Sequence, residues 1–214
     1  MADKNAQKEP CGLYLLTPEK IDDLVRFIDT LDLVLATGVV TCLQLRLKSV
    51  DDSVIIETAK ALLPICHKHE VPLLLNDRAD IAAEVDADGV HLGQEDGDVA
   101  SARTLLGHNK DIGVTCHSSL HLAFEAGEAG ANYVAFGSFF PSVTKKNATP
   151  ADKEILSTWD EVTDIACVAI GGITPDNCRE LADSGAHFVA VSSAVWNHKD
   201  GPVAAVRVFE AALA

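Results

Sequence analysis

Charged and amide side chains are concentrated in one short segment, Gln44-Leu45-Arg46-Leu47-Lys48. If this segment is extended, its period-two alternation points Gln44, Arg46 and Lys48 to one side and the two leucines to the other. One face then carries an amide and two cations, which suits an anionic ligand. The simpler interpretation is a solvated strand end with ordinary charges.

Carboxylates follow two later apolar runs, in Asn76-Asp77-Arg78 and in Gly93-Gln94-Glu95-Asp96. Two carboxylates that face one space suit Mg²⁺, which prefers oxygen ligands and commonly takes only one or two protein carboxylates. The remaining coordination positions are then left for water and substrate phosphate oxygens. The alternative role for Asp77 and Asp96 is helix capping, because each precedes a predicted short helix.

Small, hydroxyl and glycine residues follow the remaining apolar runs. Gly171-Gly172 would let backbone N–H groups approach a phosphate closely, although a tight turn alone also explains two glycines. The polar loop 139–150 has the character of a mobile lid. The hydroxyl and cationic residues that we expect to contact phosphate oxygens are Ser142, Thr144, Lys145, Ser192 and Ser193.

The histidines give weaker signals. His117 and His121 have the i, i+4 spacing of a metal pair, but no third ligand or H-E-x-x-H motif accompanies them, so we expect no metal there. His91 lies between two apolar residues, and we expect it to be a hydrogen-bonded interior histidine rather than a catalyst. The sequence does not define the role of His117.

These residues need strands to position them, and short β-branched runs alternate with longer amphipathic segments along the chain. The alternation predicts a single (β/α)8 TIM barrel over 12–214, after a flexible segment 1–11. An open doubly wound sheet is the alternative, but it usually carries its phosphate glycines after the first strand, and Leu16-Thr17-Pro18 has none. The expected strands are Leu13–Leu16, Leu43–Leu47, Pro72–Leu75, Gly89–Leu92, Ile112–Thr115, Tyr133–Phe136, Cys167–Ile170 and Phe188–Val191.

A helix is predicted after each strand, and the first is expected from about Ile21 with its start marked by Thr17-Pro18-Glu19. In such barrels the residues after each strand face the active site, and the loops after strands seven and eight commonly bind phosphate. The candidate binding residues above lie at the ends of predicted strands or directly after them. The sequence therefore predicts one functional rim.

Composition limits the classes of function. The 214 residues carry a formal net charge of −15, which would repel nucleic acid and anionic membranes over most of the surface. No apolar run approaches the length of a membrane span, and the polar N-terminus lacks a signal-peptide core, so a cytoplasmic location is expected. Six scattered cysteines without C-x-x-C pairs are expected to be reduced and mostly buried. Whether the chain forms a homo-oligomer stays open.

Taken together, five motifs resemble the thiamine-phosphate synthase family, also called thiamine-phosphate pyrophosphorylase. The resemblance covers nearly the whole chain from Leu13 onward, and it lies in the order of the motifs and their positions at strand ends. The motifs are Gln44-x-Arg46-x-Lys48, Asn76-Asp77-Arg78, Gly93-Gln94-Glu95-Asp96, Thr144-Lys145 and Ile170-Gly171-Gly172-Ile173.

The resemblance implies a Mg²⁺-dependent transferase that joins an aminopyrimidine methyl diphosphate to a thiazole phosphate and releases diphosphate. It implies that Asp77 and Asp96 bind Mg²⁺, and that Arg46, Lys48 and Lys145 neutralise the leaving group. The pyrimidine diphosphate would be held by Gln44, Arg46, Lys48 and Asn76, with Thr115 and Lys145 also meeting the diphosphate. The thiazole phosphate would be held by Ser142, Thr144, Gly172, Ser192 and Ser193.

Three positions depart from the usual pattern of the family. Thr115 stands where serine is common and Ser142 where threonine is common, so both keep a hydroxyl. Ser192 replaces an apolar residue. Two alternatives stay open, a thiazole tautomerase-like isomerase, whose chemistry His117 could suit, and a non-catalytic barrel that binds thiamine precursors to regulate a partner.

Overall fold

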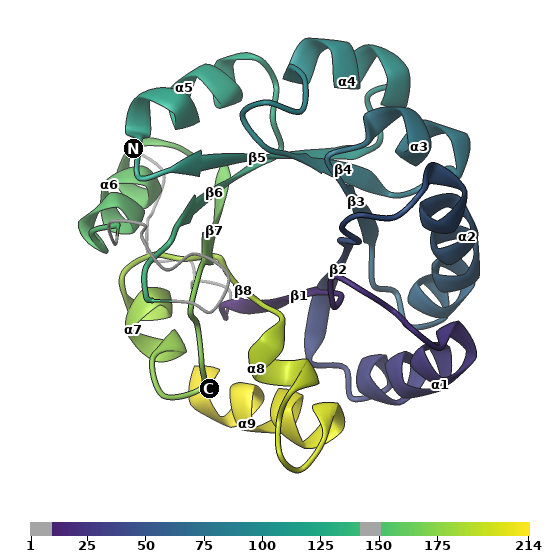
Figure 1. The fold of residues 1–214 in the computed structure, drawn as a ribbon. Coiled ribbons are helices and arrows are strands. Elements are labelled where there is room, and N and C mark those ends of the chain that lie inside the picture. Colours follow the sequence, from purple (N-terminus) through teal and green to yellow (C-terminus); the bar gives the residue numbers. More distant parts are fainter. Residues whose placement is uncertain (1–9, 142–150) are drawn as a thin grey trace.

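Eight parallel strands close into a barrel in strict chain order (Figure 1). The computed structural model describes residues 10–141 and 151–214. The closed sheet confirms the predicted TIM barrel and rules out the open doubly wound alternative. The strands are β1 (Gly12–Leu16), β2 (Val40–Leu45), β3 (Leu73–Asn76), β4 (Gly89–Leu92), β5 (Asp111–His117), β6 (Tyr133–Gly137), β7 (Ala166–Ile170) and β8 (Phe188–Val191).

Helices surround the sheet as an outer ring (Figure 1). They are α1 (Leu24–Leu35), α2 (Asp52–Lys68), α3 (Ala79–Glu84), α4 (Val99–Leu106), α5 (Leu120–Glu128), α6 (Glu154–Val162), α7 (Cys178–Asp183), α8 (Ser193–Trp196) and α9 (Pro202–Leu213). The four-residue α8 was not predicted from the sequence. It gives the loop after β8 one short turn before the last long helix.

The strands are buried on both faces, which explains why their sequences are almost continuously apolar rather than alternating. One core lies between the sheet and the helices, with Trp159, Phe136 and Phe209 among its largest fully buried side chains. A second, smaller core fills the inside of the barrel. It consists of Tyr14, Leu16, Cys42, Leu74, Tyr133, Ala135, Val168 and Ala190.

Two local predictions were wrong. Strand β2 ends at Leu45, not Leu47, so Arg46 and Lys48 lie in the loop that follows. Helix α1 begins three residues later than expected, and its cap is Asp23, whose side chain accepts a hydrogen bond from the backbone N–H of Arg26. Thr17 cannot cap it, because its buried hydroxyl accepts a hydrogen bond from the backbone N–H of Arg46 at 2.9 Å instead.

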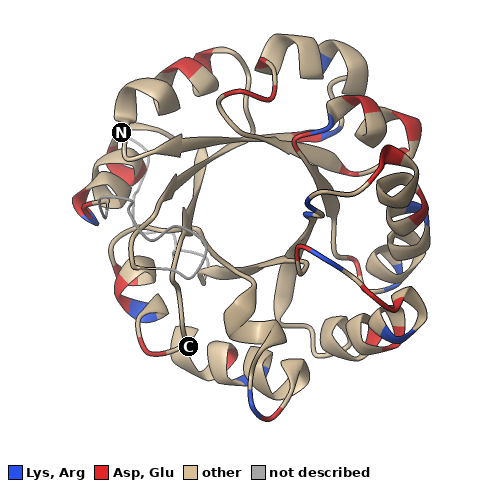
Figure 2. Cartoon of the chain, in the orientation of Figure 1, with Lys and Arg blue, Asp and Glu red and all other residues tan. Residues whose placement is uncertain are grey.

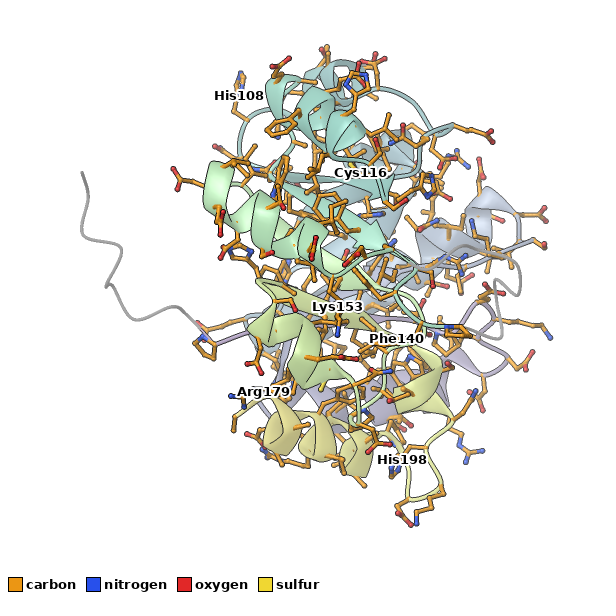
Figure 3. The ribbon with its side chains drawn as sticks, turned by 90° about the vertical axis from the view of Figure 1, so that its left-hand side faces the viewer. His108, Cys116, Phe140, Lys153, Arg179 and His198 are labelled. Carbon is orange, nitrogen blue, oxygen red and sulfur yellow. The ribbon has the colours of Figure 1, made fainter. Side chains whose placement is uncertain are left out.

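The two ends of the barrel can be followed in Figure 3, where Phe140, just after β6, and His108, just before β5, lie toward opposite ends. The carboxyl ends of the strands form the end on which Phe140 lies. Cys42, Cys66, Cys116, Cys167 and Cys178 are buried as expected, and Cys11 is half-buried. Across residues 10–141 and 151–214, no helix is long and apolar enough to cross a membrane.

Candidate active site

Charged residues reach the inner edge of the ring where β2, β3 and β4 end (Figure 2). The strands themselves are largely uncharged, and the ends of β7 and β8 carry neither Lys, Arg, Asp nor Glu. The described part of the rim therefore has a charged half and an uncharged half. Among the residues that the structure describes, Arg46, Lys48, Asp77 and Asp96 lie on the first half, and Gly172, Ser192 and Ser193 lie on the second.

The segment Gln44–Lys48, which spans the end of β2, has its three polar side chains at two levels. Gln44 is buried inside the barrel, 3% exposed, and its Nε2 donates to Oδ1 of Asn76 at 2.7 Å. Arg46 and Lys48 lie above it at the rim, where Arg46 pairs with Glu19 and Lys48 lies 3.1 Å from Asp77. The alternation of an extended strand therefore predicts the position of Gln44 correctly. It does not predict the positions of Arg46 and Lys48, because these two residues lie in the loop after the strand.

The two predicted metal ligands lie beside each other. Partial burial, followed by the charge of the neighbouring Asp77 carboxylate, raises the pKa of the Asp96 carboxyl above its ordinary value. Asp96 Oδ2 accepts a hydrogen bond from the backbone N–H of Gly93 at 3.1 Å, and a side chain at Gly93 would clash with this carboxylate. The loop after β4 is thus shaped to bring Asp96 next to Asp77.

The backbone at Asp77 is itself unusual. Its φ of 67° lies in the left-handed region, which costs a non-glycine residue about 1–2 kcal/mol. A hydrogen bond from the Asp77 N–H to the carbonyl of His91, at 2.8 Å, holds this conformation. Strain of this kind is concentrated at functional sites, where the orientation of a side chain matters more than local stability.

Helix capping does not explain either carboxylate. The residue at the capping position of α3 is Arg78, with no side-chain hydrogen bond to the helix, and α4 is capped by Asp98, which accepts from the N–H of Ser101. Asp77 and Asp96 are therefore available to a ligand. A pair of adjacent carboxylates with only oxygen donors fits Mg²⁺, which needs few protein ligands when a substrate supplies phosphate oxygens.

Among the described residues, no group of three or more His, Cys, Asp or Glu side chains is placed to hold an ion. His117 ends β5 and is exposed, and His121 lies 3.5 Å from Glu125 on the exposed face of α5.

His91 is an interior histidine, as predicted. It is 7% exposed, its Nδ1 lies 2.9 Å from the Tyr133 hydroxyl, and its Nε2 lies 2.8 Å from the Thr115 hydroxyl. Burial lowers the pKa of the imidazole to about 4; the smaller effect of Asp77 opposes this shift, and that of Arg46 adds to it. The ring is therefore neutral at physiological pH.

Four residues at or below the rim were missed by sequence reasoning. Tyr14 and Tyr133 point into the barrel and link Gln44 to His91, while Thr17 and Glu19 support the backbone and side chain of Arg46. Glu19 also accepts the Lys48 N–H with its backbone carbonyl at 3.0 Å. The inward side of the first strand, which alternates Tyr14 with Leu16, was the one signal that could have indicated Tyr14.

The uncharged half of the rim is built from backbone. Gly171 and Gly172 both have positive φ, and a Cβ at Gly172 would lie 2.6 Å from the carbonyl oxygen of Pro141. The described residues offer no hydrogen-bond acceptor to the Gly172 N–H. Ser192 donates its hydroxyl to the Thr17 carbonyl at 3.2 Å, and Ser193 begins α8. Ser142, Thr144 and Lys145, with most of the predicted lid, lie outside the described residues.

Comparison with known proteins shows the family of the chain. The family model described as thiamine monophosphate synthase matches residues 13–195. The thiamine-phosphate synthase of Rhodospirillum centenum is 50% identical over 199 residues, which cover 93% of this chain and 96% of that protein. The thiamine-phosphate synthase of Hyphomonas neptunium is 45% identical over 215 residues, covering 99% and 97%.

Solved structures give the same result. The thiamine phosphate pyrophosphorylase of Pyrococcus furiosus superimposes with a TM-score of 0.82 at 32% identity, covering 94% of this chain and 95% of that one. A 3-hexulose-6-phosphate synthase matches with a TM-score of 0.67 at 18% identity, a likeness of fold alone. The family model and these relatives show that the chain belongs to the thiamine-phosphate synthase family of transferases.

Proposed function

We propose that this barrel condenses 4-amino-2-methyl-5-(diphosphooxymethyl)pyrimidine with 4-methyl-5-(2-phosphooxyethyl)thiazole, giving thiamine phosphate and diphosphate in a Mg²⁺-assisted substitution. The observation that carries the assignment of the site is the convergence of Asp77, Asp96 and Lys48 at one point of the rim. Two carboxylates and a cation in contact suit a metal-bound diphosphate better than any uncharged ligand.

The chemistry requires charge neutralisation more than a protein nucleophile. The bond between the pyrimidine methylene carbon and the diphosphate oxygen breaks, and its electron pair leaves with the diphosphate. The electron-rich aminopyrimidine stabilises the methylene cation, and the thiazole nitrogen then forms the new C–N bond. Bound Mg²⁺, held by Asp77 and Asp96, would supply positive charge to the departing oxygens.

Arg46 and Lys48, the cations after β2, would add further positive charge to neutralise the diphosphate. Lys48 now neutralises Asp77, and Arg46 is held by Glu19, so both are already oriented toward the rim before a ligand enters. A preoriented cation contributes to catalysis because the protein does not reorganise during the reaction. Gln44 and Asn76 would hold the rest of the pyrimidine substrate, and Thr115 and Lys145 would join Arg46 and Lys48 on the diphosphate.

The thiazole phosphate would bind on the uncharged half of the rim. The N–H of Gly172 and the start of α8 at Ser193 offer backbone donors, and Ser192 would contribute through its backbone because its hydroxyl already binds Thr17. Ser142 and Thr144 would add hydroxyls. The loops after β7 and β8 are the recurrent phosphate site of this fold. The two substrates would then meet across the mouth of the barrel.

The test mixes the purified protein with both substrates and Mg²⁺ and follows thiamine phosphate and diphosphate together. The proposal predicts equimolar amounts of the two products. Saturable binding of both substrates without either product would contradict the synthase and favour the regulatory barrel. Isomerisation of the thiazole substrate alone would favour the tautomerase.

A further inference from the structure

A cavity of about 190 Å³ lies inside the barrel at its amino end, opposite the rim that carries the proposed active site. Three of the residues that line it, Asp111, Ala166 and Phe188, are the first residues of β5, β7 and β8. In Figure 3 this is the end of the barrel on which His108 lies. The cavity is therefore reached from the starts of the strands and not from their carboxyl ends.

Two tyrosines separate this cavity from the proposed active site. The buried side chains of Tyr14 and Tyr133 line the cavity, and their hydroxyl oxygens lie 2.9 Å apart. On the side of the rim, the same hydroxyls bond Gln44 and His91. Among the described residues, none of those proposed to bind substrate or metal lines the cavity. A ligand there would occupy a site distinct from the two substrate sites.

The cavity exists because the layer of side chains at this end of the barrel is small. The inside of a TIM barrel is normally filled by layers of bulky, branched side chains. Here β7 begins with Ala166 and β5 begins with Asp111. The ring of Phe188 lies against β1, where a Cβ on Gly12 would come within 2.6 Å of it. These side chains leave the space between them unfilled.

Most polar atoms of the lining are already used or neutral. The Thr41 hydroxyl donates to the Leu13 carbonyl at 3.1 Å, and the Asn132 amide oxygen accepts from the N–H of Ile112 at 2.9 Å. Burial raises the pKa of the Cys42 thiol well above its ordinary value, so the thiol stays protonated. The rest of the wall is apolar, and a ligand would meet mainly hydrocarbon and aromatic surface.

The carboxylate of Asp111 is the exception. Within residues 10–141 and 151–214 it has no hydrogen-bond or ion-pair partner, whereas its neighbour Asp88 is bound by His67 and by the N–H of Leu73. The nearby guanidinium of Arg103 donates to backbone carbonyls instead. A partly buried carboxylate without a partner is unfavourable. A cationic ligand would supply the partner that the described residues do not.

We propose that this cavity binds a small organic cation, a single ring that carries one ammonium group, with the ring inside the barrel and the ammonium group on Asp111. An apolar cavity of about 150 Å³ holds benzene, so this one has room for a ring with a short side chain. The rings of Phe188 and Tyr133 would add attraction for the cation. The net charge of −15 favours the approach of a cation over that of an anion.

The test uses benzylamine and its neutral counterpart benzyl alcohol as probes of the full chain. Binding is followed by the ¹H–¹³C methyl signals of Ala166 and Val168, which line the cavity. The proposal predicts saturable shifts of these signals and tighter binding of benzylamine than of benzyl alcohol. In Asp111→Asn the affinity for benzylamine should fall about tenfold, because a hydrogen bond between charged groups is lost. The affinity for benzyl alcohol should not change.

Asp164→Asn is the matched control, because Asp164 is an exposed carboxylate just before β7 that does not line the cavity. It should keep the native affinity for benzylamine. Ala166→Leu fills the cavity and should weaken the binding of both probes, with thermal unfolding showing that the variant is folded.

Three results would overturn the proposal: no saturable shift at Ala166 and Val168, equal affinities for the two probes in the native chain, or the same loss of affinity in Asp164→Asn as in Asp111→Asn. Native affinity in a folded Ala166→Leu variant would overturn it as well. None of these readouts involves the synthase reaction. A chain that forms no thiamine phosphate would contradict the proposed function and leave this site unaffected.

Discussion

Lys48 Nζ lies 3.1 Å from Asp77 Oδ2, and this ion pair joins the loop after β2 to the end of β3. When no metal is bound, the positive charge of Lys48 reduces the electrostatic repulsion between the Asp77 and Asp96 carboxylates. A metal and a diphosphate would supply opposite charges to the same two groups, the cation to Asp77 and the anion to Lys48. Without ligands, Lys48 and Asp77 neutralise each other. When the ligands bind, Asp77 would contact the metal and Lys48 would contact the diphosphate.

Loss of Asp96 should abolish activity without unfolding the protein. Asp96→Asn removes a carboxylate whose neighbour repels it, so we expect unchanged or slightly higher stability and a fall in kcat of at least about 100-fold. The control is Glu95→Gln, which removes a charge from the adjacent exposed position and should retain near-native kcat. Steady-state kinetics and thermal unfolding of both variants distinguish the two effects. Comparable kcat values for the two variants would remove Asp96 from the metal site.

Glu19 should act through Arg46. Glu19→Gln weakens an exposed ion pair, so its effect on the free energy of unfolding should stay below about 1 kcal/mol. Without this partner Arg46 loses orientation, and KM for the pyrimidine diphosphate should rise several-fold. Asp22→Asn breaks another exposed pair on the same loop, with Lys20, and should leave KM unchanged. A KM shift of the same size in Asp22→Asn would mean that general surface charge, not Arg46, is responsible.

Gly172→Ala should be more damaging than Gly38→Ala. Both glycines have φ near 70°, but a Cβ at Gly38 meets nothing within 4 Å, whereas one at Gly172 would lie 2.6 Å from the Pro141 carbonyl oxygen. Gly38→Ala therefore measures the backbone cost alone, about 1–2 kcal/mol. Gly172→Ala adds the clash and should also raise KM for the thiazole phosphate. Equal losses of stability and an unchanged KM in Gly172→Ala would argue against a crowded phosphate loop.

Stability should depend on pH through Asp111 at the opposite end of the barrel. Burial, and to a smaller extent Asp88, raises the pKa of Asp111, while Arg103 opposes the shift. The folded protein therefore binds this proton more tightly than the unfolded chain, and the ionised form is destabilising above the folded pKa. Asp111→Asn should stabilise the protein at pH 7, with the gain disappearing below about pH 3.9, the unfolded value. A gain that persists at pH 3 would show that the charge is not its cause.

The sequence predicted all eight strands, because each is an apolar run bounded by polar turns and buried on both faces. It also indicated Asp77 and Asp96, because residues that follow strands share one rim whatever the loop geometry. It could not show where β2 ends, since Leu45 and Leu47 are equally apolar and tertiary contacts at Thr17 terminate the strand. Nor could it bring Tyr14 to Tyr133, which are 119 residues apart and meet only because the barrel closes.

The central claim is that Asp77 and Asp96 hold Mg²⁺ on which the diphosphate leaves. Its most direct test is diphosphate release from both substrates by metal-stripped protein as Mg²⁺ is titrated back, for the native chain and for Asp77→Asn. We predict no release without Mg²⁺, full recovery in the native protein, and no recovery in Asp77→Asn at the same concentrations. Native rates in the presence of excess chelator, or an unchanged Mg²⁺ dependence in Asp77→Asn, would contradict the claim.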